Sequence, residues 1–199
     1  MIYLMRHGES TVNIERRLTC RKYDGDLTDN GCEQAEKAAH WFVGKGLTQI
    51  RYSPFHRAQQ TAERVGALVG LTPVADVDLC EMDCGKLEGR TDEAAWAIWT
   101  QVYERWLMFD LDARFPEGES YGDAIARFKR ALSQSSPDET VLLVTHGGIT
   151  RTVIPPLCVN ASALQRVDHL DNTGIIVLEH YDADRYSCSA WNLVEHLSD

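Results

Sequence analysis

Two histidines occupy the same kind of position, directly after an apolar run of the sequence. His7 follows residues 2–5 and Arg6, and His146 follows residues 140–145. Glycine comes next in both places, so the backbone can turn tightly where the run ends. Such runs are typical of buried parallel strands, and ligands bind at the carboxyl ends of those strands. A neutral imidazole there can attack phosphorus, and a protonated one can donate to a phosphoryl oxygen.

Two arginines accompany these histidines. Arg6 precedes His7, and Arg57 lies in the first turn of a helix for which Ser53 is the expected N-cap and Pro54 the first helical residue. The helix dipole disfavours a cation in that turn by about 0.3 kcal/mol or more, unless the cation faces a bound anion. A guanidinium fork matches the oxygens of a phosphate. The alternative is that the two histidines only cap strands and that Arg57 is a surface residue. This alternative does not explain why two strand-ending histidines and these arginines occur together.

Alternating strand and helix patterns must position these side chains. Thr28 is a suitable N-cap for a helix with apolar residues at helical spacing, and Ser120 with Asp123 resembles a capping box. Two strand-like runs, 174–179 and 186–194, close the chain. This alternation predicts an α/β fold with a largely parallel sheet, in a single domain over residues 1–199.

An aromatic-rich helix is predicted from Asp92 to about Phe109. Its aromatic residues recur at spacings of three and four, which places them on one broad face: Trp96, Trp99, Tyr103, Trp106 and Phe109. Core packing is the commoner use of such a stripe. The other interpretation is that residues 92–118 form a lid or cap over a substrate pocket.

The net charge of −10 argues against a nucleic-acid or anionic-membrane partner, because their phosphates would be repelled. An anionic substrate would then need a local cluster of arginine and histidine. With 199 residues, no signal-peptide pattern and no long apolar span, the chain is expected to be cytoplasmic. The sequence is compatible with a homodimer.

The six cysteines are scattered and contain no CxxC pair. In a cytoplasmic protein they are expected to be reduced, structural thiols rather than a disulfide framework. Cys80 and Cys84 are close in sequence, but no second pair follows, so the sequence predicts no metal site.

The ordered motifs of the chain resemble those of the histidine phosphatase superfamily, in the branch of phosphoglycerate mutases and small broad-range phosphatases. They run from residue 2 to the tail, and no P-loop or GxSxG pattern competes with them. The matching segments are Leu4-Met5-Arg6-His7-Gly8-Glu9-Ser10 with Asn13, Asp24 with Leu27, Thr28 and Gly31, residues 53–62, Glu81 with Gly85 and residues 87–89, Gly118-Glu119-Ser120, and Thr145-His146-Gly147-Gly148.

The resemblance implies a three-layer, phosphoglycerate mutase-like fold and a role for each matched residue. His7 would be the nucleophile that forms a phosphohistidine, and Glu81 would protonate the leaving alcohol and then activate water. Asp83 or Glu88 could replace Glu81 if the loop ran differently. The residues expected to hold the phosphoryl group are Arg6, Asn13, Arg57, His146 and Gly147. No metal or cofactor is required.

The chain departs from the family pattern in two places. Residues 19–26 replace a Gln-Gly and Asp-x-Pro pattern, and Thr19 is expected to take over the glutamine's contact. The segment between Glu81 and Ser120 is shorter than in mutases and has few cations: Lys86, Arg90, Arg105 and Arg114. The sequence therefore favours hydrolysis of small-molecule phosphate esters. Mutase-type phosphoryl transfer is the first alternative, and a non-catalytic phosphate-ligand binder is the second.

Overall fold

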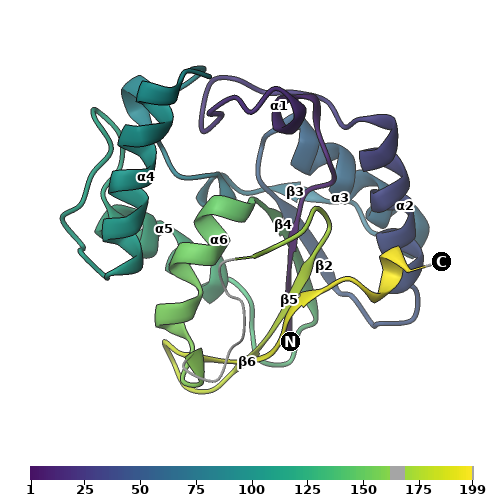
Figure 1. The fold of residues 1–199 in the computed structure, drawn as a ribbon. Coiled ribbons are helices and arrows are strands. Elements are labelled where there is room, and N and C mark those ends of the chain that lie inside the picture. The colour runs from purple at the N-terminus through teal and green to yellow at the C-terminus, as the bar shows by residue number, and fades with distance from the viewer. Residues whose placement is uncertain (162–168, 199) are drawn as a thin grey trace.

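A six-stranded mixed sheet forms the centre of the computed structural model, which describes residues 1–161 and 169–198 (Figure 1). The strand order is β3-β2-β4-β1-β5-β6. The strands are β1 (Ile2–Arg6), β2 (Gln49–Tyr52), β3 (Val74–Ala75), β4 (Val141–Thr145), β5 (Ile175–His180) and β6 (Tyr186–Leu193). The first four strands in spatial order are parallel, and β5 runs antiparallel to both β1 and β6. This confirms the predicted α/β fold with a largely parallel sheet.

Helices cover both faces of this sheet. The α-helices are α1 (Thr11–Ile14), α2 (Asp29–Phe42), α3 (His56–Val69), α4 (Glu93–Leu107), α5 (Tyr121–Ser133) and α6 (Gly147–Val153). Short 3-10 helices lie at Val77–Leu79, Gly85–Leu87, Pro155–Leu157 and Glu195–Leu197. Figure 1 shows helices on both sides of the sheet. Because successive strand residues point to opposite faces, Ile2 and Leu4 belong to one buried core with residues of α4, α5 and α6, whereas Tyr3 and Met5 belong to a second core with residues of α2 and α3. The result is three layers with two apolar cores.

Side chains close in sequence cap the N-termini of α2 and α5. The Thr28 hydroxyl accepts a hydrogen bond from the Gly31 amide at 3.0 Å, as predicted for the N-cap of α2. A Cβ atom on Gly31 would collide with the Glu9 carbonyl oxygen. Glycine therefore lets α2 approach the loop that follows β1. Ser120 and Asp123 form the predicted capping box of α5.

The aromatic residues of α4 divide between two environments. Trp106 is fully buried in the core beneath the helix, as the packing interpretation predicts. Trp96 and Trp99 are only partly buried, and Phe109, just after the helix, is 58% exposed. Across the described ranges 1–161 and 169–198, no helix combines the length and apolarity needed to cross a bilayer.

Candidate active site

The two histidines lie side by side at the carboxyl edge of the sheet. Strands β1 and β4 are parallel neighbours, with Arg6 opposite Thr145, so the residues that follow leave the sheet together. The His7 amide donates to the Thr145 carbonyl at 3.0 Å. The ring centroids of His7 and His146 are 5.2 Å apart. The register of these two parallel strands therefore places His7 and His146, which are far apart in the sequence, in one site.

Hydrogen bonds assign the tautomer of His7. Its Nδ1 lies 2.7 Å from the Gly8 carbonyl oxygen, which can only accept, so Nδ1 carries the proton. Its Nε2 then accepts from Nε of Arg57 at 3.2 Å. Burial, and then the charges of Arg57 and Arg6, hold the pKa of His7 well below its usual value. His7 is therefore neutral, with the lone pair of Nε2 directed toward the arginine.

His146 is buried and tied to the segment after β2. Its Nε2 lies 2.7 Å from the Ser53 hydroxyl, and its Nδ1 lies 3.3 Å from Nη2 of Arg57. Burial and the Arg57 charge lower the pKa of His146 well below its usual value. The predicted N-cap role of Ser53 is wrong, because α3 starts at His56 with Phe55 as its N-cap. The hydroxyl of Ser53 is bound by the imidazole instead.

Arg57 lies between the two histidines. Its side chain is only 2% exposed, and Nη1 pairs with the Asp24 carboxylate at 2.9 Å. Its Nη2 also reaches the Thr19 carbonyl at 3.4 Å. Burial lowers the pKa of Arg57, although Asp24 opposes this effect. The guanidinium therefore stays charged and is held in place from the loop of residues 19–24.

Arg6 is a buried guanidinium whose Nε lacks a partner in the described part of the chain. Its Nη1 donates to the Leu170 carbonyl at 2.8 Å, but its Nε has no hydrogen-bond acceptor among the residues that the structure describes. Burial, and then the charge of Arg151, lower the pKa of Arg6 to about 10. Buried N–H groups are nearly always satisfied, so this one is suited to an oxygen of a bound anion.

Glu81 accepts hydrogen bonds at the start of α6. Its carboxylate takes amide protons from Gly148 at 2.9 Å and Ile149 at 2.6 Å, and a third from Met82 at 3.0 Å. A Cβ atom on Gly148 would lie 2.9 Å from both carboxylate oxygens. Glycine at this position therefore leaves room for the carboxylate.

The two other carboxylates considered at this place are engaged elsewhere. Glu88 accepts from the backbone amides of residues 20–23, which it holds together. Asp83 accepts from the Gly85 amide at 2.9 Å. Neither lines the cavity described next, whereas Glu81 does.

One cavity of about 200 Å³ is lined by all eight residues that were predicted from the sequence to form the site. They are Arg6, His7, Asn13, Thr19, Arg57, Glu81, His146 and Gly147. The Asn13 amide oxygen accepts from the backbone and hydroxyl of Ser10, which fixes the carboxamide at the cavity wall. The structure therefore brings these residues together, and their roles follow under the proposed function.

Two further polar side chains line this cavity, those of Arg151 and His169, and neither was predicted from the sequence. Arg151 lies one turn into α6, and its Nε donates to the Gly147 carbonyl at 3.0 Å. Its position five residues after His146 could have indicated it, because α6 begins at Gly147 and one helical turn brings residue 151 back to the same side of the helix. His169 pairs with Asp171 at 2.9 Å and arrives from a distant loop, for which the sequence offers no local signal.

The expectation of six reduced cysteines is wrong for one pair. Cys20 and Cys84 form a disulfide, with α-carbons 6.0 Å apart and a separation of 64 positions in the sequence. The other four cysteines are free. Cys20, Cys84 and Glu88 are also the one group with the spacing of metal ligands in the described part of the chain. With both sulfur atoms bonded and Glu88 bound to amides, this group does not fit a metal.

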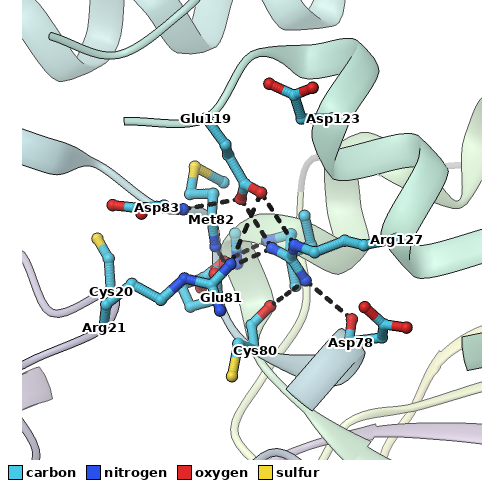
Figure 2. A network of polar contacts seen from close by, with 12 residues as sticks. Cys20, Arg21, Asp78, Cys80, Glu81, Met82, Asp83, Glu119, Asp123 and Arg127 are labelled. Carbon is cyan, nitrogen blue, oxygen red and sulfur yellow. Dashed lines mark hydrogen bonds and ion pairs between the residues drawn. The ribbon is translucent and has the colours of Figure 1, made fainter. Parts of the chain in front are cut away.

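A buried ion pair supports the Glu81 segment from α5. Figure 2 shows Arg127 facing Glu119, with the backbone of residues 78–81 around the guanidinium. Arg127 donates to the carbonyls of Asp78 and Cys80, both at 2.8 Å, and of Glu81 at 3.0 Å. Glu119 also accepts from the amide of residue 83. These hydrogen bonds hold the backbone of residues 78–83, the segment that contains Glu81.

Comparisons with known proteins agree with this arrangement. The family model "Histidine phosphatase superfamily (branch 1)" matches residues 2–194. A probable phosphoglycerate mutase GpmB of Yersinia pestis is 35% identical over 149 residues, or 73% of this chain and 69% of that protein.

Two solved structures are similar along nearly the whole chain. A mycobacterial glucosyl-3-phosphoglycerate phosphatase in complex with VO3 has a TM-score of 0.80 and 27% identity, covering 96% of this chain and 98% of that one. Phosphoserine phosphatase of Entamoeba histolytica, in complex with 3-phosphoglyceric acid, has a TM-score of 0.74 and 25% identity, covering 99% and 98%.

Proposed function

The chain belongs to branch 1 of the histidine phosphatase superfamily, and on that premise we propose that it hydrolyses phosphomonoesters of small molecules through a phosphohistidine on His7. The observation that carries this proposal is the tautomer of His7: the Gly8 carbonyl holds the proton on Nδ1, so Nε2 keeps its lone pair, and His7 lines the cavity. In the free protein Nε of Arg57 donates to this lone pair, so attack on phosphorus requires the bound phosphoryl group to take over that donor. A neutral imidazole in a cationic setting is a competent nucleophile toward phosphorus.

The first step transfers the phosphoryl group. Nε2 of His7 forms a bond to phosphorus as the bond to the ester oxygen breaks, and Glu81 gives that oxygen its proton. Arg6, whose Nε has no acceptor among residues 1–161 and 169–198, and Arg57 neutralise charge on the phosphoryl oxygens in the transition state. Because the carboxylate of Glu81 accepts three amide protons in the free protein, proton delivery requires substrate to rearrange this contact.

The second step releases phosphate. Water attacks phosphorus, Glu81 takes the proton, and the bond to Nε2 breaks, which regenerates the neutral imidazole. Asn13, Thr19, His146 and Gly147 line the same cavity and would complete the binding of the phosphoryl group. No step uses a metal, so chelators are expected to leave the rate unchanged.

The cations between Glu81 and Ser120 favour hydrolysis over mutase chemistry. In mutases of this family, the segment between these two positions carries basic residues that bind the carboxylate of the substrate. Each of the four cations in this segment forms a surface ion pair outside that cavity: Lys86 with Glu117, Arg90 with Asp92, Arg105 with Asp110 and Arg114 with Asp123.

Turnover of p-nitrophenyl phosphate tests the proposal. His7→Ala is expected to abolish it, whereas His40→Ala, which changes an exposed histidine of α2, keeps the wild-type rate. A phosphoenzyme trapped from the wild type should be labile in acid and stable in alkali. Turnover by His7→Ala would refute the mechanism, and isomerisation of phosphoglycerate in the presence of bisphosphoglycerate would favour a mutase. Binding of phosphate without any turnover would indicate a binding protein.

A further inference from the structure

A second cavity, of about 280 Å³, opens directly beside the phosphate cavity. The two cavities have five lining residues in common, so they form one continuous space: Asn13, Thr19, Glu81, Gly148 and Arg151. The residues that line the second cavity alone are Arg17, Leu18, Cys20, Met82, Trp96 and Trp99. We call four of them, Leu18, Met82, Trp96 and Trp99, the tryptophan subsite.

Contacts behind the two indole rings hold them in place. Trp96 donates from its Nε1 to the Arg16 carbonyl at 3.1 Å. Trp99 stacks on Tyr103, with ring centroids 4.6 Å apart and planes 16° from parallel. The indoles themselves meet edge to face, 5.6 Å apart. Two rings fixed in this way offer a ready-made wall to a ligand, with little side-chain entropy left to lose.

The floor of the subsite is apolar. Leu18 and Met82 are 4% and 1% exposed, and both belong to the core beneath α4. Hydroxyl groups of a polyhydroxylated ligand that face Leu18, Met82 and the indole rings would lose water without gaining partners. A flat ring would lose little and would gain contact with the indoles.

The position of Glu81 indicates which cavity holds the phosphoryl group and which holds the leaving alcohol. In the proposed reaction, the nucleophile and the leaving oxygen lie in line on opposite sides of phosphorus. The acid that protonates the leaving oxygen therefore marks the side on which the alcohol departs. Glu81 lines both cavities, whereas His7 lines only the first. The alcohol of a bound ester would thus extend from Glu81 toward the tryptophans.

We propose that the tryptophan subsite binds the alcohol portion of the substrate and selects phosphomonoesters whose alcohol carries a flat aromatic ring. The proposal rests on the phosphatase function proposed above, and it assigns that function a substrate class. In this arrangement residues 92–118 act as a cap over the leaving group through the face of α4 that carries Trp96 and Trp99.

The test compares three esters of primary alcohols, so that the chemistry of the leaving oxygen is similar: 2-phenylethyl phosphate, n-propyl phosphate and glucose 6-phosphate. The ratio of kcat/KM for the first two esters is expected to be about tenfold in favour of the aromatic one, as stacking and apolar burial of a ring imply. Trp99→Ala and Trp96→Ala should bring this ratio toward one. Trp41→Ala, which changes a half-buried tryptophan of α2 on the other face of the sheet, should leave it unchanged.

The wild-type ratio tests the proposal even if a variant fails to fold. Equal kcat/KM for the phenylethyl and propyl esters, or preference for glucose 6-phosphate, would overturn the tryptophan subsite while leaving the phosphatase function intact. A wild-type preference that both tryptophan variants retain would place the ring elsewhere and also overturn it. Absence of turnover for every ester, p-nitrophenyl phosphate included, would instead refute the phosphatase function.

Discussion

Replacing Arg127 with methionine tests whether the ion pair of Figure 2 positions Glu81. The side chains of Arg127 and Glu119 are only 8% and 10% exposed, and they meet through two hydrogen bonds of 2.9 and 2.7 Å. Burial by itself would lower the pKa of Arg127, but the hydrogen bonds and charge of Glu119 outweigh it and raise that pKa. Methionine keeps much of the length and apolar contact of the arginine and removes the charge.

The loss of stability can be bounded from burial. Removing one partner of a buried ion pair destabilises a protein by about 3–5 kcal/mol when the other charge is left uncompensated. Without Arg127, Glu119 keeps Arg21 at 3.7 Å and the amide of residue 83, so we expect the lower end of this range, about 3 kcal/mol. Arg130→Met is the matched control, since Arg130 lies three residues further along α5 and pairs with Asp78 while 63% exposed. An exposed pair contributes about 0.2–1 kcal/mol. The free energy of unfolding should therefore fall several-fold more in the Arg127 variant.

Urea unfolding followed by tryptophan fluorescence measures the free energies of unfolding of the two variants. Steady-state kinetics with two esters tests whether Arg127 positions Glu81. General acid catalysis contributes about 100-fold or more, and it matters most for a poor leaving group. Arg127→Met should therefore slow n-propyl phosphate more than p-nitrophenyl phosphate. Destabilisation within 1 kcal/mol of the Arg130 control would refute the energetic reasoning. Equal rate losses for the two esters would refute the positioning of Glu81.

Three further predictions concern the same site. Gly148→Ala should lower kcat about tenfold or more in steady-state assays, because its Cβ would lie 2.9 Å from the Glu81 carboxylate. The control is Gly122→Ala, whose Cβ would meet no neighbouring atom closer than 3.4 Å, and it should keep the wild-type rate. Denaturation at a series of pH values should show constant stability above about pH 6.5 and a decline below it. The depressed pKa values of His7 and His146 mean that the unfolded chain binds more protons there, which gives a slope of up to about 1.4 kcal/mol per pH unit for each histidine. A flat profile between pH 6.5 and 5 would contradict this. Cys20→Ser should lower the free energy of unfolding by about 4 kcal/mol, because the disulfide spans 64 residues, and titration of the denatured wild type should find four free thiols rather than six.

The main elements of the site follow from local patterns in the sequence. Apolar runs end in His7 and His146, and parallel strands carry their following residues to one edge, so the meeting of the two imidazoles could be predicted. The caps at Thr28 and Ser120 depend on side chains within three residues and were predicted correctly. Arg57 was found because a cation in the first turn of a helix is out of place without an anion.

Contacts between distant segments could not be predicted in this way. The Ser53 hydroxyl binds His146 rather than capping α3, and Cys20 bonds to Cys84 across 64 residues. The helical spacing of the aromatic stripe could not separate Trp106, which fills the core, from Trp99, which faces the cavity.

The sequence by itself determined the α/β fold, the order of the elements and the eight residues that meet in one cavity. The fold and the positions of Arg6, His7 and His146 depend on periodicity or on a strand end, which are local features of the sequence. Asn13, Thr19, Glu81 and Gly147 were identified through motifs that resemble those of the histidine phosphatase family. Only the tertiary structure decided what surrounds that cavity: the disulfide beside its rim, Arg151 in its wall and the indoles next to Glu81. These features depend on which side chains fill the space between packed layers, and packing is settled only when all the elements are in place.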